Sequence, residues 1–460
     1  MGLEQVVSGM PSRRSLLKWS VATLALAGCA DVNYEAPAAS VGASFDAASP
    51  ARQAGAHQWW RSFQDSQLDQ LIAAGKARNL DLQQAIEAIN EARAASDSVG
   101  AADLPQVSAT AGATRGDTSN TGTAQVSSVG LGVSWLLDIF GANRNARKAA
   151  AAQLDAAYLS ADVARLVMES SITSAYIDLR YYQQSMALTR RSLDSRRSSL
   201  DLTRTQVELG EAARLDLLQA EQLVAEGEAA LPAYEVGFDQ AVARLATLTA
   251  RRVAELKPAL QRGAAQPRPR LKPSVGLPAD VVRERPDVRM AERSYAAAAY
   301  EVGVAQAQFY PSVSLSGSIT PTNIRHGGSI TYWTLGPSLN LPIFTGGANT
   351  ANLKAAESRA VQAKLGWEKS VLNAIEEVES GLAAYNRDSR NISAQGRLVS
   401  TSAETLDLAR TNFSLGEGTF LAVLDAERTY LSAQQGLASA ERQRAADFVS
   451  LSVAAAGASQ

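Results

Sequence analysis

The sequence predicts a mainly α-helical chain that also carries four β-strands, in a fold that can close a β-barrel only by assembly of several copies. Three observations predict this fold class: very long helical stretches, two separate pairs of short alternating segments, and an internal repeat. Aromatic residues make up only 6% of the 460 residues. This composition favours extended helices that share thin seams over globular domains with thick cores.

The N-terminus predicts an export signal followed by a lipid attachment site. Basic residues at 12–18 precede a short apolar run, and Leu26-Ala27-Gly28-Cys29 resembles a bacterial lipobox. The apolar run is too short to span a bilayer. We therefore expect residues 1–28 to be a signal peptide and Cys29, the only cysteine, to be lipidated.

Two features of this leader leave alternatives open. Arg13-Arg14 also resembles a twin-arginine signal, although the pair equally supplies the positive region of a general secretory signal. A start at Met10 would give a leader of more usual length. Ala30 rather than an aspartate follows the cysteine, which favours an outer-membrane destination, with outer-membrane lipid around the anchor.

The first part of the mature chain changes from a tether to helix. Residues 29–56 are rich in Ala, Ser and Pro and have little periodicity, which predicts a lipidated tether. From Trp59-Trp60 onward, apolar residues recur with helical spacing. Pro105 is expected to end this helical region, because proline lacks the backbone N–H that a helix interior needs.

Two β-hairpins are predicted from alternation of small or apolar residues with polar ones. The first covers residues 107–117 and 126–139, and the second covers residues 312–320 and 329–343. Each pair of segments is joined by a glycine-containing connection. Such pairs of alternating segments are typical of antiparallel hairpins.

Very long helices are predicted between and after the hairpins. No proline occurs from residue 106 to residue 231, and none follows Pro342. Within residues 158–207 the apolar positions alternate at spacings of three and four, which is the packing period of coiled coils. A helix over residues 142–209 would reach roughly 100 Å at about 1.5 Å per residue.

An internal repeat covers the mature body. "TQVELGEAARLDLLQAE" at 205–221 returns as "TNFSLGEGTFLAVLDAE" at 411–427, so that Glu211 corresponds to Glu417 and the offset is 417 − 211 = 206 residues. Residues 79–112 align with residues 285–318 at the same offset. The repeat predicts three segments after the tether: a first structural repeat at 57–256, a linker at 257–278 and a second structural repeat at 279–460.

Four strands cannot close a membrane barrel, because even the smallest membrane barrels have about eight strands. An open sheet would expose unpaired backbone groups to lipid at a high cost in free energy. Three copies of the chain would supply 3 × 4 = 12 strands. We therefore expect a homotrimeric channel, in which a 12-stranded β-barrel continues into a tube of long helices, an α-barrel.

Composition argues against nucleic acid, metal and enzymatic chemistry. The formal net charge is −2 and no basic block suggests phosphate binding. The only histidines, His57 and His326, are far apart in sequence, so no metal or other cofactor is expected. Glu376, Glu377 and Glu379 lie on a predicted long helix without a histidine, which favours a solvated face over acid–base catalysis. We expect no enzymatic activity.

Aromatic residues at two places allow more than one interpretation. Trp59-Trp60 is interpreted as packing of the N-terminal segment rather than as a stacking site for a ligand. Trp135, Tyr332 and Trp333 lie in the strand regions, where they fit either an interfacial aromatic girdle or ordinary packing between strands.

Several segments together resemble one protein family. "GLPADVVRERPDVRMAERSYAAAAYEVGVAQAQFYPSVSLSGS" at 276–318 resembles the signature of the outer-membrane efflux proteins, the TolC-like outer-membrane factors. It is most similar to their lipoprotein branch, which serves resistance-nodulation-division pumps. "LLDIFGANRNARKAA", "PIFTGGANTANLKAAESRA" and "LGEGTFLAVLDAERTYLSAQ" follow the family in order, and the resemblance covers residues 57–455.

The resemblance implies a function and partners. The family implies a homotrimer with an outer-membrane β-barrel, a periplasmic α-barrel and an equatorial domain formed by the termini and the mid-chain segment. Docked to a periplasmic adaptor protein and an inner-membrane resistance-nodulation-division transporter, such a trimer passively conducts small molecules, such as drugs or other toxic compounds, to the exterior. No Walker-type glycine loop occurs in the sequence, so the energy would come from the inner-membrane partner.

The resemblance also implies a periplasmic gate at the tip of the second helical hairpin, formed by Leu421, Asp425 and Arg428. Asp425 replaces Gln219 of the first repeat. Three aspartates around a threefold axis would repel one another unless cations or basic groups bound them. The alternative is a solvated carboxylate near a helix start, which the helix dipole favours. Gly210 and Gly416 are predicted to end the helices before these tips.

Two other functions compete with this hypothesis. The same scaffold serves ducts for secreted polypeptides or metal ions, although the chain has no methionine or histidine cluster for metal recognition. A lipid-anchored coiled-coil rod would explain the long helices. It would not need the two β-hairpins.

Overall fold

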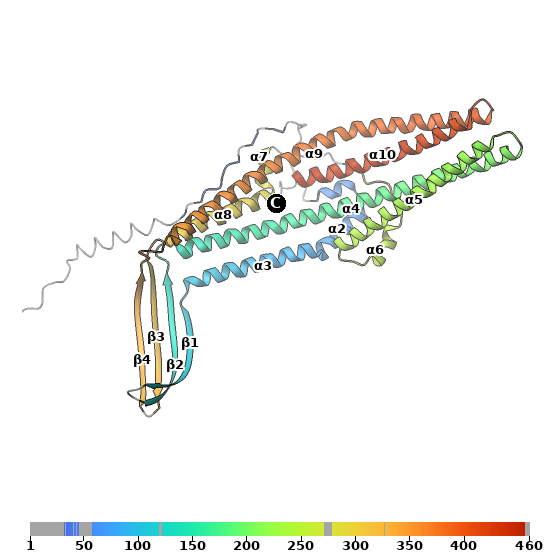
Figure 1. Ribbon diagram of the computed structural model, residues 1–460. Helices are drawn as coiled ribbons and strands as arrows, with labels where there is room; N and C mark the ends of the chain where they lie inside the picture. Colours follow the sequence, from blue (N-terminus) through green and yellow to red (C-terminus); the bar gives the residue numbers. More distant parts are fainter. Residues whose placement is uncertain are drawn as a thin grey trace, which may run out of the picture. The chain divides into compact units, whose positions relative to one another are not determined.

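The computed structural model describes residues 32, 34–39, 41–42, 44–45, 58–118, 122–270, 278–325 and 327–455. In these segments the chain is mainly helical and carries four strands (Figure 1). None of the helices in the described segments is both long enough and apolar enough to cross a membrane. The elements follow in this order: η1 Trp59–Phe63, α2 Ser66–Arg78, α3 Leu80–Gly100, η2 Ala101–Asp103, β1 Gln106–Thr118, β2 Gly122–Leu137, α4 Ala142–Glu208, α5 Arg214–Leu248, α6 Val253–Leu260, α7 Pro278–Glu284, α8 Pro286–Ala307, β3 Ser312–Ile324, β4 Gly328–Asn340, α9 Ala348–Ser414 and α10 Phe420–Ala455.

The internal repeat is reproduced element by element. Helices α4 and α9 each contain 67 residues, and their first residues, Ala142 and Ala348, differ by 348 − 142 = 206. The same offset relates β1 to β3 and the starts of β2 and β4, α3 and α8, and α5 and α10. Each repeat is therefore a helix, a β-hairpin, a long helix, a turn and a second helix.

The four strands form one antiparallel sheet in the order β1-β2-β3-β4 (Figure 1). The two hairpins meet along β2 and β3, where Leu131 pairs with Ile319 and Ser128 with Thr322. Strand β3 runs to Ile324, beyond the predicted end at residue 320. Pro321 remains inside it, and the pairing with β2 is interrupted at this proline, which has no N–H to donate.

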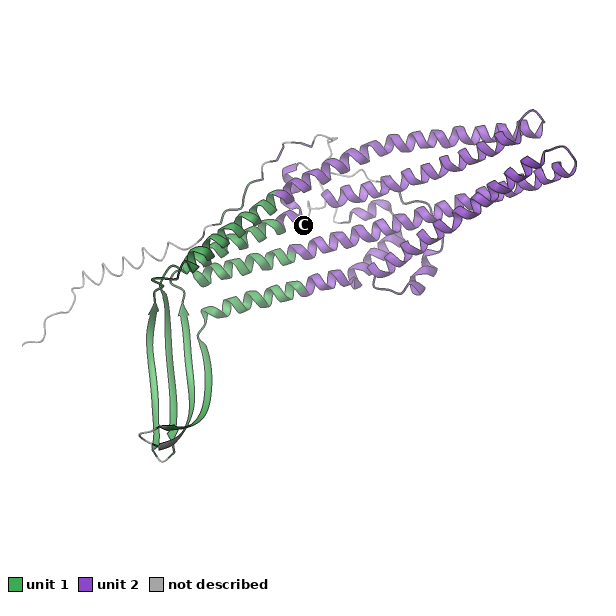
Figure 2. Cartoon of the chain, in the orientation of Figure 1, with its two compact units in different colours: residues 1–38, 88–158, 290–368 green, residues 39–87, 159–289, 369–460 purple. Residues whose placement is uncertain are grey.

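The described chain divides into two compact units, and neither coincides with one repeat (Figure 2). Unit 1 comprises residues 1–38, 88–158 and 290–368 and contains the sheet. Unit 2 comprises residues 39–87, 159–289 and 369–460 and contains the helical hairpins. Both units take segments from both repeats, because the long helices run through them.

The main hydrophobic core lies in unit 2. Leu68 and Ile72 of α2, Ile172 and Tyr176 of α4 and Leu245 of α5 are almost completely buried in it. Trp59 and Trp60 are also buried there, with their rings in an edge-to-face arrangement. This confirms the interpretation of the two tryptophans as packing residues. A second core cluster, which includes Leu223, Phe420, Val423 and Leu424, lies near the ends of the two helical hairpins.

Candidate functional site

The strand register gives the sheet one apolar face and one polar face. Odd-numbered residues share one face, and two of its rows across the strands are Val107–Val133–Gly317–Leu335 and Ala109–Leu131–Ile319–Trp333. Even-numbered residues share the other face, with the row Ser108–Gly132–Ser318–Thr334. Since side chains alternate along a strand, this pattern follows directly from the sequence.

The apolar face is exposed within the chain. Val107, Leu131, Ile319, Trp333 and Leu335 all have large exposed fractions. On the polar face, hydroxyl groups bond across β3 and β4, with 2.7 Å between Ser314 Oγ and Ser338 Oγ and 3.0 Å between Ser318 Oγ and Thr334 Oγ1. The sheet could therefore separate an apolar phase from water.

The aromatic residues of the strands differ in their surroundings. Trp135 donates a hydrogen bond from Nε1 to the backbone oxygen of Asp103, at 2.8 Å. Tyr332 and Trp333 are exposed on opposite faces of β4. Trp333 shares the apolar face with Leu131 and Trp135, so the rings of both tryptophans can contact an apolar phase, whereas Tyr332 lies on the polar face.

The two helical hairpins of unit 2 turn by the same capping motif. At the end of α4 the Gly210 N–H donates to Val207 O at 3.1 Å and the Glu211 N–H donates to Gln206 O at 2.8 Å. At the end of α9, Gly416 and Glu417 make the equivalent bonds at 3.1 and 2.9 Å. Both glycines have positive φ, at +78° and +76°. This is the Schellman motif, and it confirms the predicted caps.

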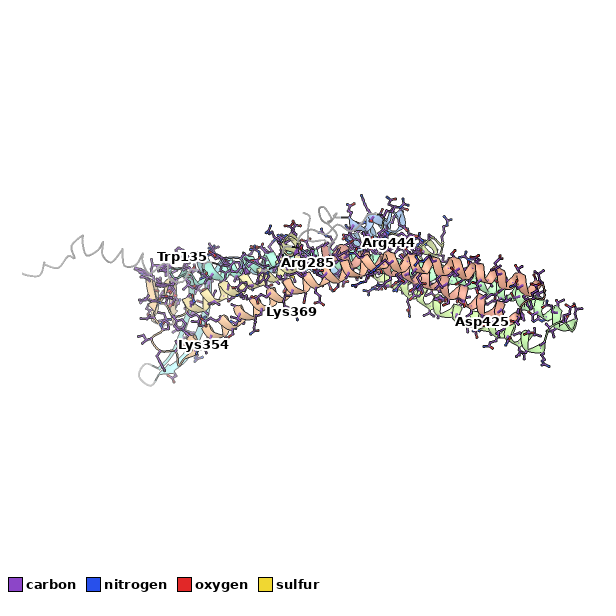
Figure 3. The ribbon with its side chains drawn as sticks, turned by 90° about the horizontal axis from the view of Figure 1, so that it is seen from above. Trp135, Arg285, Lys354, Lys369, Asp425 and Arg444 are labelled. Atoms are coloured by element: carbon purple, nitrogen blue, oxygen red, sulfur yellow. The ribbon has the colours of Figure 1, made fainter. Side chains whose placement is uncertain are left out.

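The three predicted gate residues lie on the first turns of α10, beyond the second of these caps. Leu421, Asp425 and Arg428 are all exposed. Asp425 Oδ1 lies 3.6 Å from Arg428 Nη1, and Figure 3 shows the Asp425 side chain on α10. The equivalent positions of the first repeat are Leu215, Gln219 and Gln222, so the ion pair belongs to the second hairpin alone.

A buried ion pair near this tip was not predicted. Glu427 of α10 has a side chain that is only 3% exposed, and its Oε1 lies 2.5 Å from Arg410 Nη2 of α9. Ser195 and Ser199 of α4 donate hydrogen bonds to the same oxygen at 3.3 and 3.2 Å. Arg410 also contacts Ser195 Oγ. This group, which we call the Glu427 cluster, links α4 of the first hairpin to α9 and α10 of the second.

Arg196 of α4 contributes a further buried cation close to the cluster. Its Nη1 donates to Leu223 O of α5 at 2.7 Å. Burial lowers the pKa of the Arg196 guanidinium, although the nearby Glu427 carboxylate opposes this shift. The sequence does not single out the Arg410–Glu427 pair, because Arg204 and Glu221 occupy the equivalent positions in the first repeat.

A second polar cluster lies in the middle of unit 2. Asp388 of α9 is buried and shares a hydrogen bond with Asp447 of α10. Burial, and then the neighbouring Asp447 charge, raise the pKa of Asp388 to about 6, while Arg444 acts in the opposite direction. In the first repeat the equivalent positions of Asp388, Asp447 and Arg444 are Tyr182, Ala241 and Phe238. The cluster therefore belongs to the second repeat alone.

The remaining polar candidates do not assemble into a catalytic centre. Glu377 lies 2.7 Å from the buried Arg285, which also pairs with Asp287. In the described part of the chain, no group of three or more His, Cys, Asp or Glu side chains could hold a metal ion. Cys29, His57 and His326 lie outside the described residues.

Comparison with known proteins identifies the family. A sequence profile of the Outer membrane efflux protein family matches residues 71–251 and again residues 277–457. The chain belongs to this family. The two matches start 277 − 71 = 206 residues apart, which is the offset of the repeat.

Relatives and solved structures agree with this assignment. Nodulation protein T of Rhizobium leguminosarum bv. viciae is 43% identical over 404 residues, which cover 87% of this chain and 84% of the relative. The antibiotic efflux pump outer membrane protein ArpC of Pseudomonas putida is 33% identical and covers 92% of this chain and 91% of its own length. The solved outer-membrane channel OprN has a TM-score of 0.86 at 30% identity, over 93% of this chain and 99% of that one.

These findings confirm the predicted family, the mainly helical fold class with four strands per chain, and the outer-membrane location with a periplasmic extension. The protein is an outer-membrane efflux channel subunit and not an enzyme. It functions with an efflux pump.

Proposed function

We propose that three copies of the chain form one passive exit duct of a tripartite efflux system. The observation that carries this proposal is the sheet, which has an exposed apolar face, a hydroxyl-rich face, and one open edge on each of β1 and β4. In lipid these edges must be paired, because unsatisfied backbone groups cost several kcal/mol each. Three sheets supply 3 × 4 = 12 strands, within the range of closed membrane barrels.

A passive duct needs partners that supply energy and deliver the cargo. We assign a periplasmic adaptor protein and an inner-membrane resistance-nodulation-division transporter as partners, with the adaptor contacting the hairpin tips. The cargo is a class of small molecules such as drugs or other toxic compounds, in keeping with the name of the related antibiotic efflux pump protein. The leader at 1–28, the lipidated Cys29, the tether at 29–56 and the two repeats at 57–256 and 279–460 around the linker at 257–278 are part of the same proposal.

The gate is assigned to Leu421, Asp425 and Arg428. Around a threefold axis, three Asp425 carboxylates would form a negative ring that attracts cations, and Leu421, about one turn away on the helix, would add an apolar constriction. Arg428 stands 3.6 Å from Asp425 and can neutralise part of this charge. Because both side chains are exposed within one chain, they are free to pair across subunits.

The repeat supplies a matched control for testing this gate. Cells that express Asp425→Ala in place of the wild-type chain should become more sensitive to a large polar antibiotic that the outer membrane normally excludes. Gln219→Ala changes the equivalent position of the first hairpin and should leave sensitivity unchanged. Equal sensitivity of both variants and the wild type, at equal amounts of protein in the outer membrane, would remove Asp425 from the gate.

A further inference from the structure

The two repeats carry the same arginine–glutamate pair near their tips, but in different surroundings. Arg410 and Glu427 of the second repeat correspond to Arg204 and Glu221 of the first, since 410 − 204 and 427 − 221 both equal 206. The second pair is 2.5 Å apart, with Glu427 only 3% exposed. The first pair is 3.9 Å apart, with Glu221 48% exposed. The arginine–glutamate ion pair is thus short and buried in the second repeat but longer and exposed to solvent in the first.

Helix α4 completes the second pair. Its Ser195 and Ser199 hydroxyls bind Glu427, and its Leu202 lines the same hollow as Arg410. Leu424, one turn before Glu427, is only 4% exposed. The equivalent Leu218 of the first repeat is 51% exposed. The first hairpin therefore presents the same surface, formed by Arg204, Leu218 and Glu221, and within the described segments no helix covers it.

A surface like the one that α4 presents to Glu427 is exposed on α9. At the repeat offset of 206 residues, Thr401 is equivalent to Ser195, Thr405 to Ser199 and Leu408 to Leu202. The two hydroxyls and the leucine are preserved. Thr401, Thr405 and Leu408 are all exposed and, at spacings of four and three, lie on one face of the helix. In the described part of the chain, the Arg204–Glu221 surface and the Thr401–Thr405 surface are thus both left uncovered.

We propose that Arg204 and Glu221 of one chain dock against Thr401 and Thr405 of α9 in a second copy, and so repeat between subunits the contact that the Glu427 cluster makes within one chain. The reason is the order of the hairpins in a ring. In a ring of identical subunits, first and second hairpins alternate. Each second hairpin contacts the first hairpin of its own chain on one side, and each first hairpin therefore contacts the second hairpin of a neighbouring chain on its other side. This inference rests on the ring assembly of the proposed function.

The contact would change the surroundings of the first pair. Glu221 would lose water and gain two hydroxyl donors, and Arg204 would close on it as Arg410 closes on Glu427. Charge-assisted bonds of this kind are stronger than exposed ion pairs. Leu218 and Leu408 would be covered by the same contact. Each subunit interface would then be held near the tips by the same chemistry as the interior of each chain.

Site-specific cross-linking tests the proposal in the full-length protein, which has Cys29 as its only cysteine. Glu221→Cys combined with Thr401→Cys, and separately with Thr405→Cys, is purified in detergent and treated with a short reagent that carries two thiol-reactive maleimide groups. Each chain then carries one reactive group for each neighbour. The expected result is a ladder of covalent dimer and trimer on a denaturing gel.

Two matched pairs serve as controls. Ser195→Cys with Glu427→Cys reproduces the contact within one chain and should cross-link without change of chain number. Glu221→Cys with Asp407→Cys places the second cysteine on another side of α9 and should give monomer.

Monomer alone from both test pairs, from a protein that assembles and conducts ions and whose intrachain control cross-links, would overturn the contact and leave the duct intact. A chain that does not assemble at all would overturn both the contact and the proposed duct. More product from the Asp407 pair than from the Thr401 and Thr405 pairs would place a different face of α9 at the interface and so overturn the proposal.

Discussion

Replacing Arg410 by methionine removes the cation of the Glu427 cluster while it keeps most of the aliphatic stem. Glu427, at 3% exposure, would then remain buried with only two serine hydroxyls as partners. Removal of one partner of a buried ion pair typically costs 3–5 kcal/mol, because the other charge is left without compensation. We take about 3 kcal/mol for the local opening of the tip, since Arg410 itself is 43% exposed.

Neutralising the other partner, Glu427, should cost less free energy. Glu427→Gln keeps the shape of the side chain and an acceptor oxygen, and Arg410 can turn to water because it is already 43% exposed. The loss is one charge-assisted interaction, about 1.5 kcal/mol. Arg197→Met is the matched control, because Arg197 and Glu228 pair across α4 and α5 at 2.6 Å with both side chains 54% exposed. Such an exposed pair contributes about 0–1 kcal/mol.

Hydrogen exchange of the tip amides measures these costs directly, since local opening controls their exchange. At 1.4 kcal/mol per factor of ten, Arg410→Met should accelerate exchange of peptides from residues 190–205 and 406–430 roughly 100-fold, and Glu427→Gln roughly tenfold. The double variant should exchange no faster than Arg410→Met, because it removes the uncompensated charge. If Glu427→Gln or Arg197→Met accelerated exchange as much as Arg410→Met, an uncompensated Glu427 charge could not be the cause of the opening.

Two further predictions concern stability. The pKa of Asp388 is raised from 3.8 to about 6 in the folded chain, so its contribution to stability is complete below pH 3.8 and is lost as the pH rises through 6. The apparent melting temperature of the helices should therefore fall between pH 4 and 6.5 in the wild type and fall less in Asp388→Asn; equal slopes would contradict the shift. Gly416→Ala should cost about 1 kcal/mol because of its φ of +76°. Gly366→Ala, within α9 and with no atom within 4 Å of the added Cβ, should gain about 0.5–1 kcal/mol; melting shifts of the same sign would argue against this account.

Elements with a strong period were predictable from the sequence. The long helix expected at 142–209 is α4, Ala142–Glu208, because three- and four-residue spacing continues without a proline. Pro105 does precede β1, which begins at Gln106. Strand ends were less predictable. Strand β4 begins at Gly328 and stops at Asn340, short of the expected end at residue 343, because Pro342 follows closely.

The candidate site was predictable only in part. The helix ends at Gly210 and Gly416 were predictable, because glycine adopts the positive φ of a helix cap more readily than other residues. The Glu427 cluster was missed because the first repeat carries the same residue types in Arg204 and Glu221. Only the packing of α4 against α9 and α10 decides which pair is buried. The raised pKa of Asp388 likewise depends on its burial beside Asp447. The two residues lie on α9 and α10, which meet only in the folded chain.

The proposed duct is closed at its helical tips. The most direct test is the ionic current through purified protein in planar bilayers, with wild type and Asp425→Ala compared at equal protein amounts. We expect rare, small openings for the wild type and frequent, larger openings for Asp425→Ala. Absence of current from both, in assembled and correctly folded protein, would contradict the duct itself.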